Sequence, residues 1–202
     1  ARHAAPCIHF VDIVPALMQQ LACKLQHHFP QPTTTAASCR WQLHCHDVAQ
    51  LSLAQFPGRQ LVIMAGVGGE LMARLVCGII QRHPAMALDF LLCPTNRPFT
   101  LRSQLIALDV RLQRELLITE RQRHYELLLL STAASTGEAL SPVGEQLWLS
   151  HSAEQAQAAA SYLRQTLQYY QRMQPSQSSW AQQVVEAYQQ VRLKRIPSNS
   201  TS

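Results

Sequence analysis

The stretch Leu61-Val62-Ile63-Met64-Ala65-Gly66-Val67-Gly68-Gly69-Glu70-Leu71 joins an apolar run to a cluster of three glycines, after which apolar residues return at helical spacing. This order is typical of a buried parallel strand, a tight turn and the opening of a helix. In open α/β sheets, ligands bind beyond the carboxyl ends of parallel strands, and glycines there let a ligand approach the main chain. The stretch therefore predicts a ligand-binding edge of an α/β sheet.

The composition indicates a folded protein with a net positive charge. The 202 residues are 47% hydrophobic and 14% charged, with a formal net charge of +5, so a packed core is expected and a polyanionic partner is favoured. Two groups of basic residues carry much of this charge: Arg97, Arg102, Arg111, Arg114, Arg121 and Arg123, then Arg192, Lys194 and Arg195. An ordinary solvated surface is the alternative interpretation of these groups.

The cysteines and the length of the apolar runs indicate the cellular compartment. The six cysteines form neither CxxC pairs nor a dense disulfide scaffold, so we expect reduced core residues. No apolar run reaches the roughly 18 residues that span a bilayer, so a cytoplasmic protein without membrane contact is expected.

Strands and helices alternate along the first part of the chain. The periodicity predicts strands at 7–13, 41–45, 61–65 and 88–93, with helices after the first, third and fourth, the last of them continuing through Leu108. Strands 112–118 and 125–130 are joined by only a short polar link, so they must form an antiparallel hairpin. Helices 153–173 and 180–193 predict a helical hairpin. We therefore expect an α/β domain over 1–131, a linker over 132–150, a helical hairpin over 151–196 and a disordered tail over 197–202.

Two carboxylates follow successive strands of this series. Asp12 ends the first strand, and Asp47 follows the second. One carboxylate can accept hydrogen bonds from both hydroxyls of a ribose, and the other from the exocyclic amine of adenine. Because a glycine-rich turn follows the next strand, an adenosine-bearing ligand is the favoured hypothesis. Helix capping or loop solvation is the alternative for each carboxylate.

Other ligands fit the sequence less well. The glycine cluster lacks the third glycine of a dinucleotide-binding fingerprint, since Leu71 stands there, which disfavours a nicotinamide dehydrogenase. His44 and His46 face away from Cys45 on a strand, and no second pair of ligands lies nearby in the sequence, so no metal site is expected.

Several segments together resemble a known family. Ile63 to Gly69 resembles the IAGMGG segment of the bacterial tRNA (adenine-N1)-methyltransferases of the TrmK type. Residues 92–102 resemble that family's LQPN…W.LR strand and turn, and residues 115–130 resemble its closing hairpin. The similarity runs from Cys7 to Leu130, and the helical hairpin is similar in place and kind to the family's C-terminal domain.

The resemblance implies a Rossmann-like, class I S-adenosylmethionine-dependent methyltransferase fold with an antiparallel last strand. It also implies cofactor contacts from three strand ends: Asp12, Ile13, Asp47, Val48, Ala65, Gly66 and Val67. The family's first strand and its glycine loop, which holds the methionine end of the cofactor, have no counterpart here. Because a central strand cannot be removed without leaving buried backbone groups unpaired, we interpret the chain as part of a longer protein.

The implied reaction is methyl transfer to a ring nitrogen of adenine in tRNA or another structured RNA. Thr95 and Asn96 are the expected catalytic residues, although the family has Asn directly after the proline. The expected substrate-binding residues are Arg97, Phe99, Arg121 and Arg123. A proline-rich turn with a capping Asn is the alternative for this segment. A non-catalytic RNA- or protein-binding module and a small-molecule or protein methyltransferase remain alternative functions.

Overall fold

The computed structural model describes residues 7–30, 40–56, 58–133, 137–173 and 178–196. The chain divides into two compact units, one made of residues 1–55 and 78–84, the other of residues 56–77 and 85–202. The predicted tail at 197–202 lies outside the described residues. The boundaries expected between α/β domain, linker and helical hairpin stay a prediction, and the helical hairpin belongs to the second unit.

The first unit contains a parallel pair of strands. β1 (Cys7–Asp12) pairs with β2 (Arg40–Cys45), and Asp12 lies opposite Cys45. Between them runs α1 (Pro15–His28), which begins with a proline at its first position, where the missing N–H costs no helical hydrogen bond. Two short 3-10 turns follow, η1 (Val48–Gln50) and η2 (Leu53–Gln55). The predicted strand–helix–strand order is confirmed.

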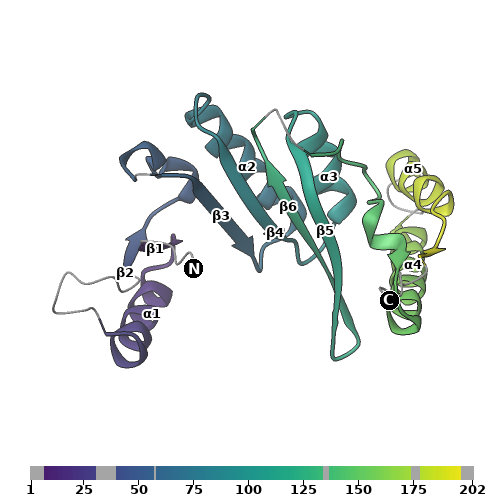
Figure 1. Cartoon of the computed structure of the whole chain (residues 1–202), viewed down its shortest axis with the longest axis horizontal. Helices are drawn as coiled ribbons and strands as arrows, with labels where there is room; N and C mark the ends of the chain where they lie inside the picture. The colour runs from purple at the N-terminus through teal and green to yellow at the C-terminus, as the bar shows by residue number, and fades with distance from the viewer. Residues whose placement is uncertain (1–6, 31–39, 57, 134–136, 174–177, 197–202) are drawn as a thin grey trace, which may run out of the picture. The chain divides into compact units, whose positions relative to one another are not determined.

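The second unit is built on a four-stranded mixed sheet of order β3-β4-β6-β5. β3 (Gln60–Ala65) and β4 (Leu88–Cys93) are parallel, whereas β6 (Arg123–Ser131) runs antiparallel to both β4 and β5 (Arg111–Glu120). α2 (Gly69–Arg82) and α3 (Pro98–Ile106) lie along one face of this sheet (Figure 1). The antiparallel last strand agrees with the expected fold. α3 ends at Ile106, so the prediction that Leu108 is helical is wrong.

The core lies between the sheet and these helices. Leu88, Phe90 and Leu92 alternate with half-buried residues along β4 and are fully buried. Other fully buried apolar side chains in the unit include Met72, Val76, Leu101, Leu105, Leu128 and Leu130. By contrast, Leu61 and Ile63 of β3 are 53% and 64% exposed. Among the described strands, β3 has only β4 as a neighbour and β1 has only β2, and the expected first strand has no counterpart.

The β5–β6 hairpin is longer and tighter than predicted. Glu120 lies opposite Arg123, so only two residues make the turn, and both Arg121 and Gln122 have positive φ, of 48° and 66°. Two central residues of positive φ are typical of a type I′ turn, whose twist matches the strands. Leu92 of β4 lies opposite Leu128 of β6. The tip therefore projects about 13 Å or more beyond the carboxyl end of β4.

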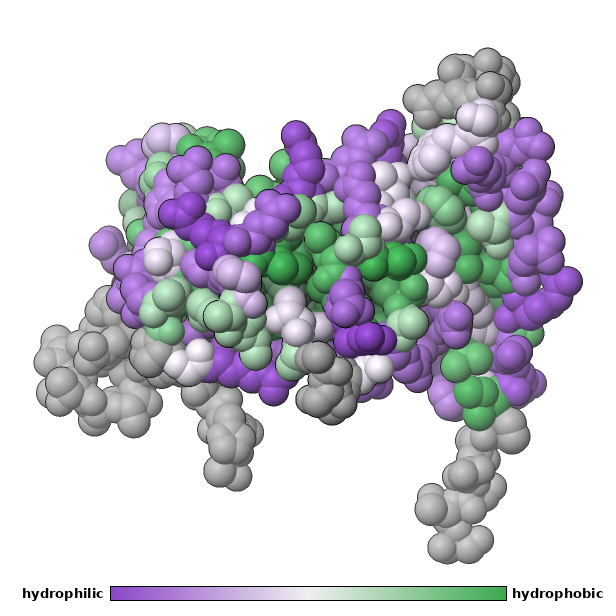
Figure 2. All heavy atoms as spheres, turned by 90° about the horizontal axis from the view of Figure 1, so that it is seen from above, coloured by the Kyte–Doolittle hydropathy of each residue, from purple (hydrophilic) through white to green (hydrophobic). Residues whose placement is uncertain are grey.

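The two C-terminal helices pack against each other, as the predicted helical hairpin requires. α4 (Ala153–Met173) has the predicted bounds. α5 (Ser178–Gln189) ends before Leu193, and Lys194–Arg195 forms β8 beside β7 (Leu149–Ser150). η3 (Gln146–Trp148) leads into β7. The buried cluster of this region joins α4 and α5 to η3: Leu147, Trp148, Ala159, Tyr170, Val184, Val185 and Tyr188. In Figure 2 hydrophilic residues rim this end of the molecule, with apolar residues between them.

The expectation that the cysteines are core residues is wrong. Of the five described, Cys23 and Cys45 are exposed and Cys7, Cys77 and Cys93 are half-buried. Apolar neighbours in the sequence do not decide which side of a strand or helix a given thiol occupies. In the part of the chain that the structure describes, no helix is long and apolar enough to cross a membrane.

Candidate functional site

In the first unit, the two predicted ligand carboxylates lie at the same end of the parallel pair, because Asp12 is level with Cys45 and Asp47 follows two residues later. Oδ1 of Asp12 accepts a hydrogen bond from the Val14 amide at 2.8 Å, and Oδ1 of Asp47 accepts one from the Ala49 amide at 2.9 Å. Each carboxylate thus caps its own turn through one oxygen. Oδ2 of each makes no hydrogen bond within the described residues, so a ligand role stays a prediction.

The residues beside these carboxylates complete the predicted adenosine contacts. Ile13 is 68% exposed and directly follows Asp12, whereas Val48 is half-buried and opens η1. Ile13 follows the last residue of β1, whereas Val48 follows Asp47, which lies two residues beyond the end of β2. Their contact with a ligand stays a prediction.

A histidine pair in the same unit escaped the sequence analysis. Nδ1 of His9 lies 3.0 Å from Nε2 of His44, and the two rings stack with centroids 5.2 Å apart. Burial and then the charge of a neighbouring ring lower the pKa of both histidines. Within the described residues no group of three or more His, Cys, Asp or Glu side chains could hold a metal ion.

In the second unit, two neighbouring loops bring predicted cofactor and catalytic residues together. Ala65 ends β3 opposite Cys93 of β4, so the loops after both strands start at the same edge. The Thr95 amide donates to the carbonyl of Val67 at 3.0 Å, and the Gly69 amide donates to the carbonyl of Asn96 at 3.1 Å. The side chains of Thr95 and Asn96 are exposed at this edge.

The three glycines of this loop have different roles. Gly66 has a φ of +82°, and a Cβ built there would meet nothing within 4 Å, so its side faces open space. A Cβ on Gly68 would lie 2.8 Å from Oδ1 of Asn96, and one on Gly69 would lie 2.5 Å from the carbonyl oxygen of Arg97. Gly69 is therefore needed for close packing against the backbone of the neighbouring turn, whereas the exposed side chain of Asn96 is free to move away from a Cβ at Gly68. The sequence alone did not reveal this role of Gly69.

Arg97 connects the two loops through an ion pair. Its guanidinium bonds the carboxylate of Glu70 in the first turn of α2, and this hydrogen bond raises the pKa of Arg97. Glu70 was missed by the sequence analysis, although an acidic residue in the first turn of a helix is a recognisable signal. Arg97 also has a φ of 49°, the left-handed region, just before α3. Its contact with substrate stays a prediction.

Phe99 is half-buried in the second unit, so its ring is not fully exposed for stacking with a base. Its ring meets Trp180 edge-on at a centroid distance of 6.5 Å and Tyr188 at 6.1 Å. These contacts tie the first turn of α3 to the helical hairpin. Packing against the hairpin occupies the ring in this structure, and a contact with a base stays a prediction.

The predicted basic residues divide into exposed and buried ones. Arg121 and Arg123 are exposed at the tip of the β5–β6 hairpin. Arg102, grouped with them in the sequence, is fully buried, so the expectation that it belongs to a phosphate-facing surface is wrong. Its Nη1 lies 2.7 Å from Oε2 of Glu115, and its Nη2 lies 2.8 Å from Oε2 of Glu126.

The buried ion pairs extend to the helical hairpin. Burial by itself lowers the pKa of Arg102, but the charges of Glu126 and Glu115 outweigh it and raise that pKa. The hydroxyl of Tyr162 on α4 donates to Oε1 of Glu126 at 2.6 Å. The network therefore fixes α3, the sheet and α4 in one packed arrangement.

Comparisons with known proteins show which family and which solved structures this chain is similar to. Residues 2–128 match the sequence model of the methyltransferase domain family. A Streptococcus pneumoniae protein, described as a candidate tRNA (m1A22) methyltransferase, is 16% identical and has a TM-score of 0.66, with 91% of this chain and 79% of that chain covered. Its complex with S-adenosyl-L-methionine has a TM-score of 0.61, at the same identity, with 91% and 78% covered.

A third structure extends the likeness to another organism. TrmK of M. capricolum, in complex with S-adenosyl-homocysteine, is 13% identical with a TM-score of 0.60, and 91% of this chain and 79% of that chain are covered. A search of curated protein sequences gives no significant match. At these identities the structural likenesses establish the fold, and the predicted class I α/β fold is confirmed.

Proposed function

This chain belongs to the methyltransferase domain family, and from that premise we propose that it transfers a methyl group from S-adenosylmethionine to a ring nitrogen of adenine in tRNA. The observation that carries the proposal is the extent of the structural likeness. It covers 91% of the chain, well beyond the methyltransferase domain at residues 2–128, and so includes the helical hairpin. The S. pneumoniae protein with this arrangement is described as a candidate tRNA (m1A22) methyltransferase and binds S-adenosyl-L-methionine in its second structure, and TrmK of M. capricolum binds S-adenosyl-homocysteine.

The residues suit the adenosine part of the cofactor. In the proposal, the free oxygens of Asp12 and Asp47 accept hydrogen bonds from the ribose and the adenine amine, and Ile13 and Val48 contact the apolar faces. Ala65, Gly66 and Val67 complete the cofactor-binding set, and the open space beside Gly66 leaves its backbone accessible. S-adenosylmethionine supplies an electrophilic methyl group on its sulfonium.

Catalysis in this proposal depends on alignment. N1 of adenine carries an in-plane lone pair, so the reaction requires no strong general base, and positioning of the nitrogen supplies most of the acceleration. Thr95 and Asn96 are exposed at the edge beside the glycine loop, where their hydroxyl and amide can hold the edge of a base. The base must leave its stack to reach them.

The tip of the β5–β6 hairpin suits contact with RNA phosphates. It projects from the same edge as the loops after β3 and β4, and it carries Arg121 and Arg123. Arg97 and Arg121 are two of the four described non-glycine residues with positive φ. The positive φ of Arg121 is required by the two-residue turn, which leaves its side chain exposed at the tip. Because tRNA is cytoplasmic, we infer the same compartment for this enzyme.

Calorimetry and a methylation assay on the natural full-length protein test the proposal. Asp12→Ala should weaken binding of S-adenosylmethionine by about 1.5–3 kcal/mol, the cost of losing a charge-assisted hydrogen bond. Asp89→Asn is the matched control, because Asp89 pairs with Arg59 near the opposite end of β4. When a tRNA transcript has been methylated by the protein, primer extension along it should stop at one adenine.

Three outcomes would contradict parts of the proposal. Absence of cofactor binding by the wild-type protein would favour a non-catalytic module. Binding without tRNA methylation would favour a small-molecule or protein substrate. Equal cofactor affinity in folded Asp12→Ala and wild-type protein would remove Asp12 from the site.

A further inference from the structure

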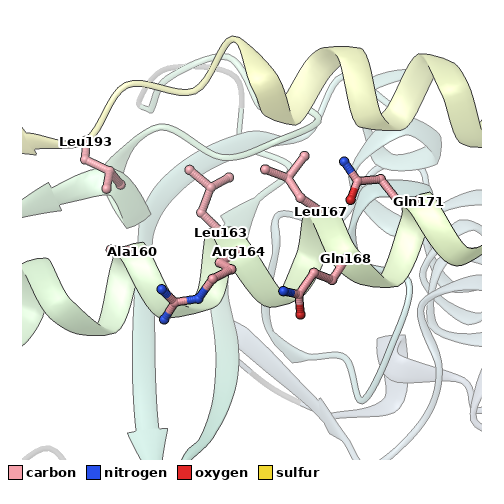
Figure 3. A pocket seen from close by; sticks show the side chains of 7 residues that line it. All are labelled: Ala160, Leu163, Arg164, Leu167, Gln168, Gln171 and Leu193. Atoms are coloured by element: carbon pink, nitrogen blue, oxygen red, sulfur yellow. The ribbon is translucent and has the colours of Figure 1, made fainter.

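A groove runs along the outer side of α4 in the second unit, beside the segment that follows α5. It has a volume of about 380 Å³ (Figure 3). Seven residues line it: Ala160, Leu163, Arg164, Leu167, Gln168, Gln171 and Leu193. None of these belongs to the predicted catalytic or cofactor residues, and the groove lies on the helical hairpin rather than on the loops after β3 and β4.

The floor of the groove is apolar and firmly supported. Leu163 and Leu167 extend from α4 towards the segment that carries Leu193, and both pack against the buried cluster of the hairpin (Figure 3). Leu193 is 45% exposed. An apolar side chain held at the surface in this way gains free energy when a ligand covers it.

The rim is polar, and no acidic residue lines the groove. Gln168 and Gln171 each offer an amide that can both donate and accept hydrogen bonds, as the edge of a nucleobase requires. Arg164 adds a positive charge, and the exposed Arg192, Lys194 and Arg195 follow on the adjoining segment. Within the described residues none of these four cations forms an ion pair.

We propose that this groove binds one unpaired nucleotide of the RNA substrate, with its base on Leu163, Leu167 and Leu193 and its phosphate near Arg164. The inference rests on the proposed function, since it concerns a second contact with the same RNA. An anionic ligand fits the unpaired cations, and the combination of an apolar floor with amide edges fits a base. A carboxylate-rich peptide would also meet the cations, and its backbone could also pair with the amides, so displacement of bound tRNA by polyglutamate tests that alternative.

Binding of a tRNA transcript to the full-length protein tests the groove. Leu193→Ser should weaken tRNA binding roughly three- to tenfold, the range for the partial loss of one buried aliphatic side chain. The variant should fold, because Leu193 is 45% exposed and its replacement costs little packing. Leu17→Ser is the matched control, since Leu17 is 51% exposed on α1 in the other unit. Arg164→Gln should lower the slope of log affinity against log salt by roughly 0.7–0.9.

A photo-crosslink locates the base directly. A transcript containing 4-thiouridine should crosslink to a peptide that includes residues 160–171, and Leu193→Ser should reduce that crosslink. Affinity for S-adenosylmethionine should be equal in all variants, because none of the changed residues belongs to the proposed cofactor set.

Each contrary result has a distinct meaning. Unchanged tRNA affinity in folded Leu193→Ser and Arg164→Gln, with methylation intact, would overturn the groove and leave the proposed function standing. A loss in Arg164→Gln alone would make the surface purely electrostatic and overturn the nucleotide site. Failure of the wild-type protein to bind tRNA would overturn both proposals, and displacement of bound tRNA by polyglutamate at equal charge would assign the groove to an acidic protein.

Discussion

Replacing a buried tyrosine of the helical hairpin by phenylalanine is expected to lower the free energy of unfolding at one position and not at two others. Tyr162 donates a hydrogen bond of 2.6 Å to Oε1 of the buried Glu126. Tyr188 is fully buried, and its hydroxyl has no hydrogen-bond partner within the described structure. Removing the hydroxyl from each residue therefore deletes a charge-assisted hydrogen bond in one case and an unsatisfied buried group in the other.

The magnitudes follow from this difference. Tyr162→Phe should lower the free energy of unfolding by about 1.5–3 kcal/mol, because a hydrogen bond to a charged group is lost and the carboxylate stays buried. Tyr188→Phe should leave the free energy unchanged or raise it by up to about 1 kcal/mol, since a desolvated hydroxyl is removed without loss of packing. Tyr170→Phe should behave like Tyr188→Phe, because its buried hydroxyl also lacks a partner.

Urea unfolding followed by tryptophan fluorescence measures these changes, because Trp148 belongs to the buried cluster and Trp180 packs against it. With a denaturant slope of about 2.5 kcal/mol per molar urea, Tyr162→Phe should lower the midpoint by roughly 0.6–1.2 M. Equal destabilisation by Tyr162→Phe and Tyr188→Phe would refute the reasoning, since the two hydroxyls would then contribute equally.

Three further predictions concern the loops, the ion pair and alkaline pH. Gly69→Ala should destabilise the protein by more than about 2 kcal/mol because its Cβ would meet the carbonyl of Arg97, whereas Gly66→Ala should cost only about 1 kcal/mol of backbone strain; thermal unfolding ranks them, and the reverse order would contradict the assignment. Glu70→Gln should reduce kcat more than it raises KM for the cofactor, because Arg97 loses its ion-pair partner, whereas Asp89→Asn, which removes the charge that pairs with Arg59, should leave kcat unaltered; an unchanged kcat in Glu70→Gln would show that the Arg97–Glu70 pair does not position the turn. Burial raises the pKa of Tyr188 above its ordinary value of about 10, so this residue ionises first in the unfolded chain, and its contribution to stability is present below about pH 10 and lost above it. Tyr188→Phe should therefore reduce the fall in stability that urea titrations measure between about pH 9 and 11.5.

Local sequence patterns were sufficient to predict most of the helices and strands. The predicted bounds of β4 and α4 are those of the structure, because a run of alternating burial and a long amphipathic helix both leave a clear period in the sequence. The antiparallel hairpin followed from the shortness of its link alone. The glycine loop after β3 and the exposed Thr95 and Asn96 beside it were also placed correctly, since strand order dictates which loops share an edge.

Long-range pairing was beyond those patterns. Arg102 has the same chemistry as Arg121, yet one is buried between Glu115 and Glu126 and the other is exposed at a hairpin tip. The partners of Arg102 lie 13 and 24 residues away on two strands, and only the packing of α3 on the sheet brings them within reach. A charge is buried or solvated according to what surrounds it in three dimensions, and no local period records that.

The glycines show the same division between sequence and tertiary structure. Their position after an apolar run is sufficient to predict a tight turn at the end of a parallel strand, because only glycine adopts such a backbone without steric cost. Which atoms a Cβ would meet at each glycine depends on the neighbouring loop. A Cβ would meet open space at Gly66, the side-chain amide of Asn96 at Gly68 and the carbonyl of Arg97 at Gly69. Backbone conformation is a local property and can be predicted from the sequence, whereas the approach of Asn96 and Arg97 depends on the pairing of β3 with β4, which only the folded chain establishes.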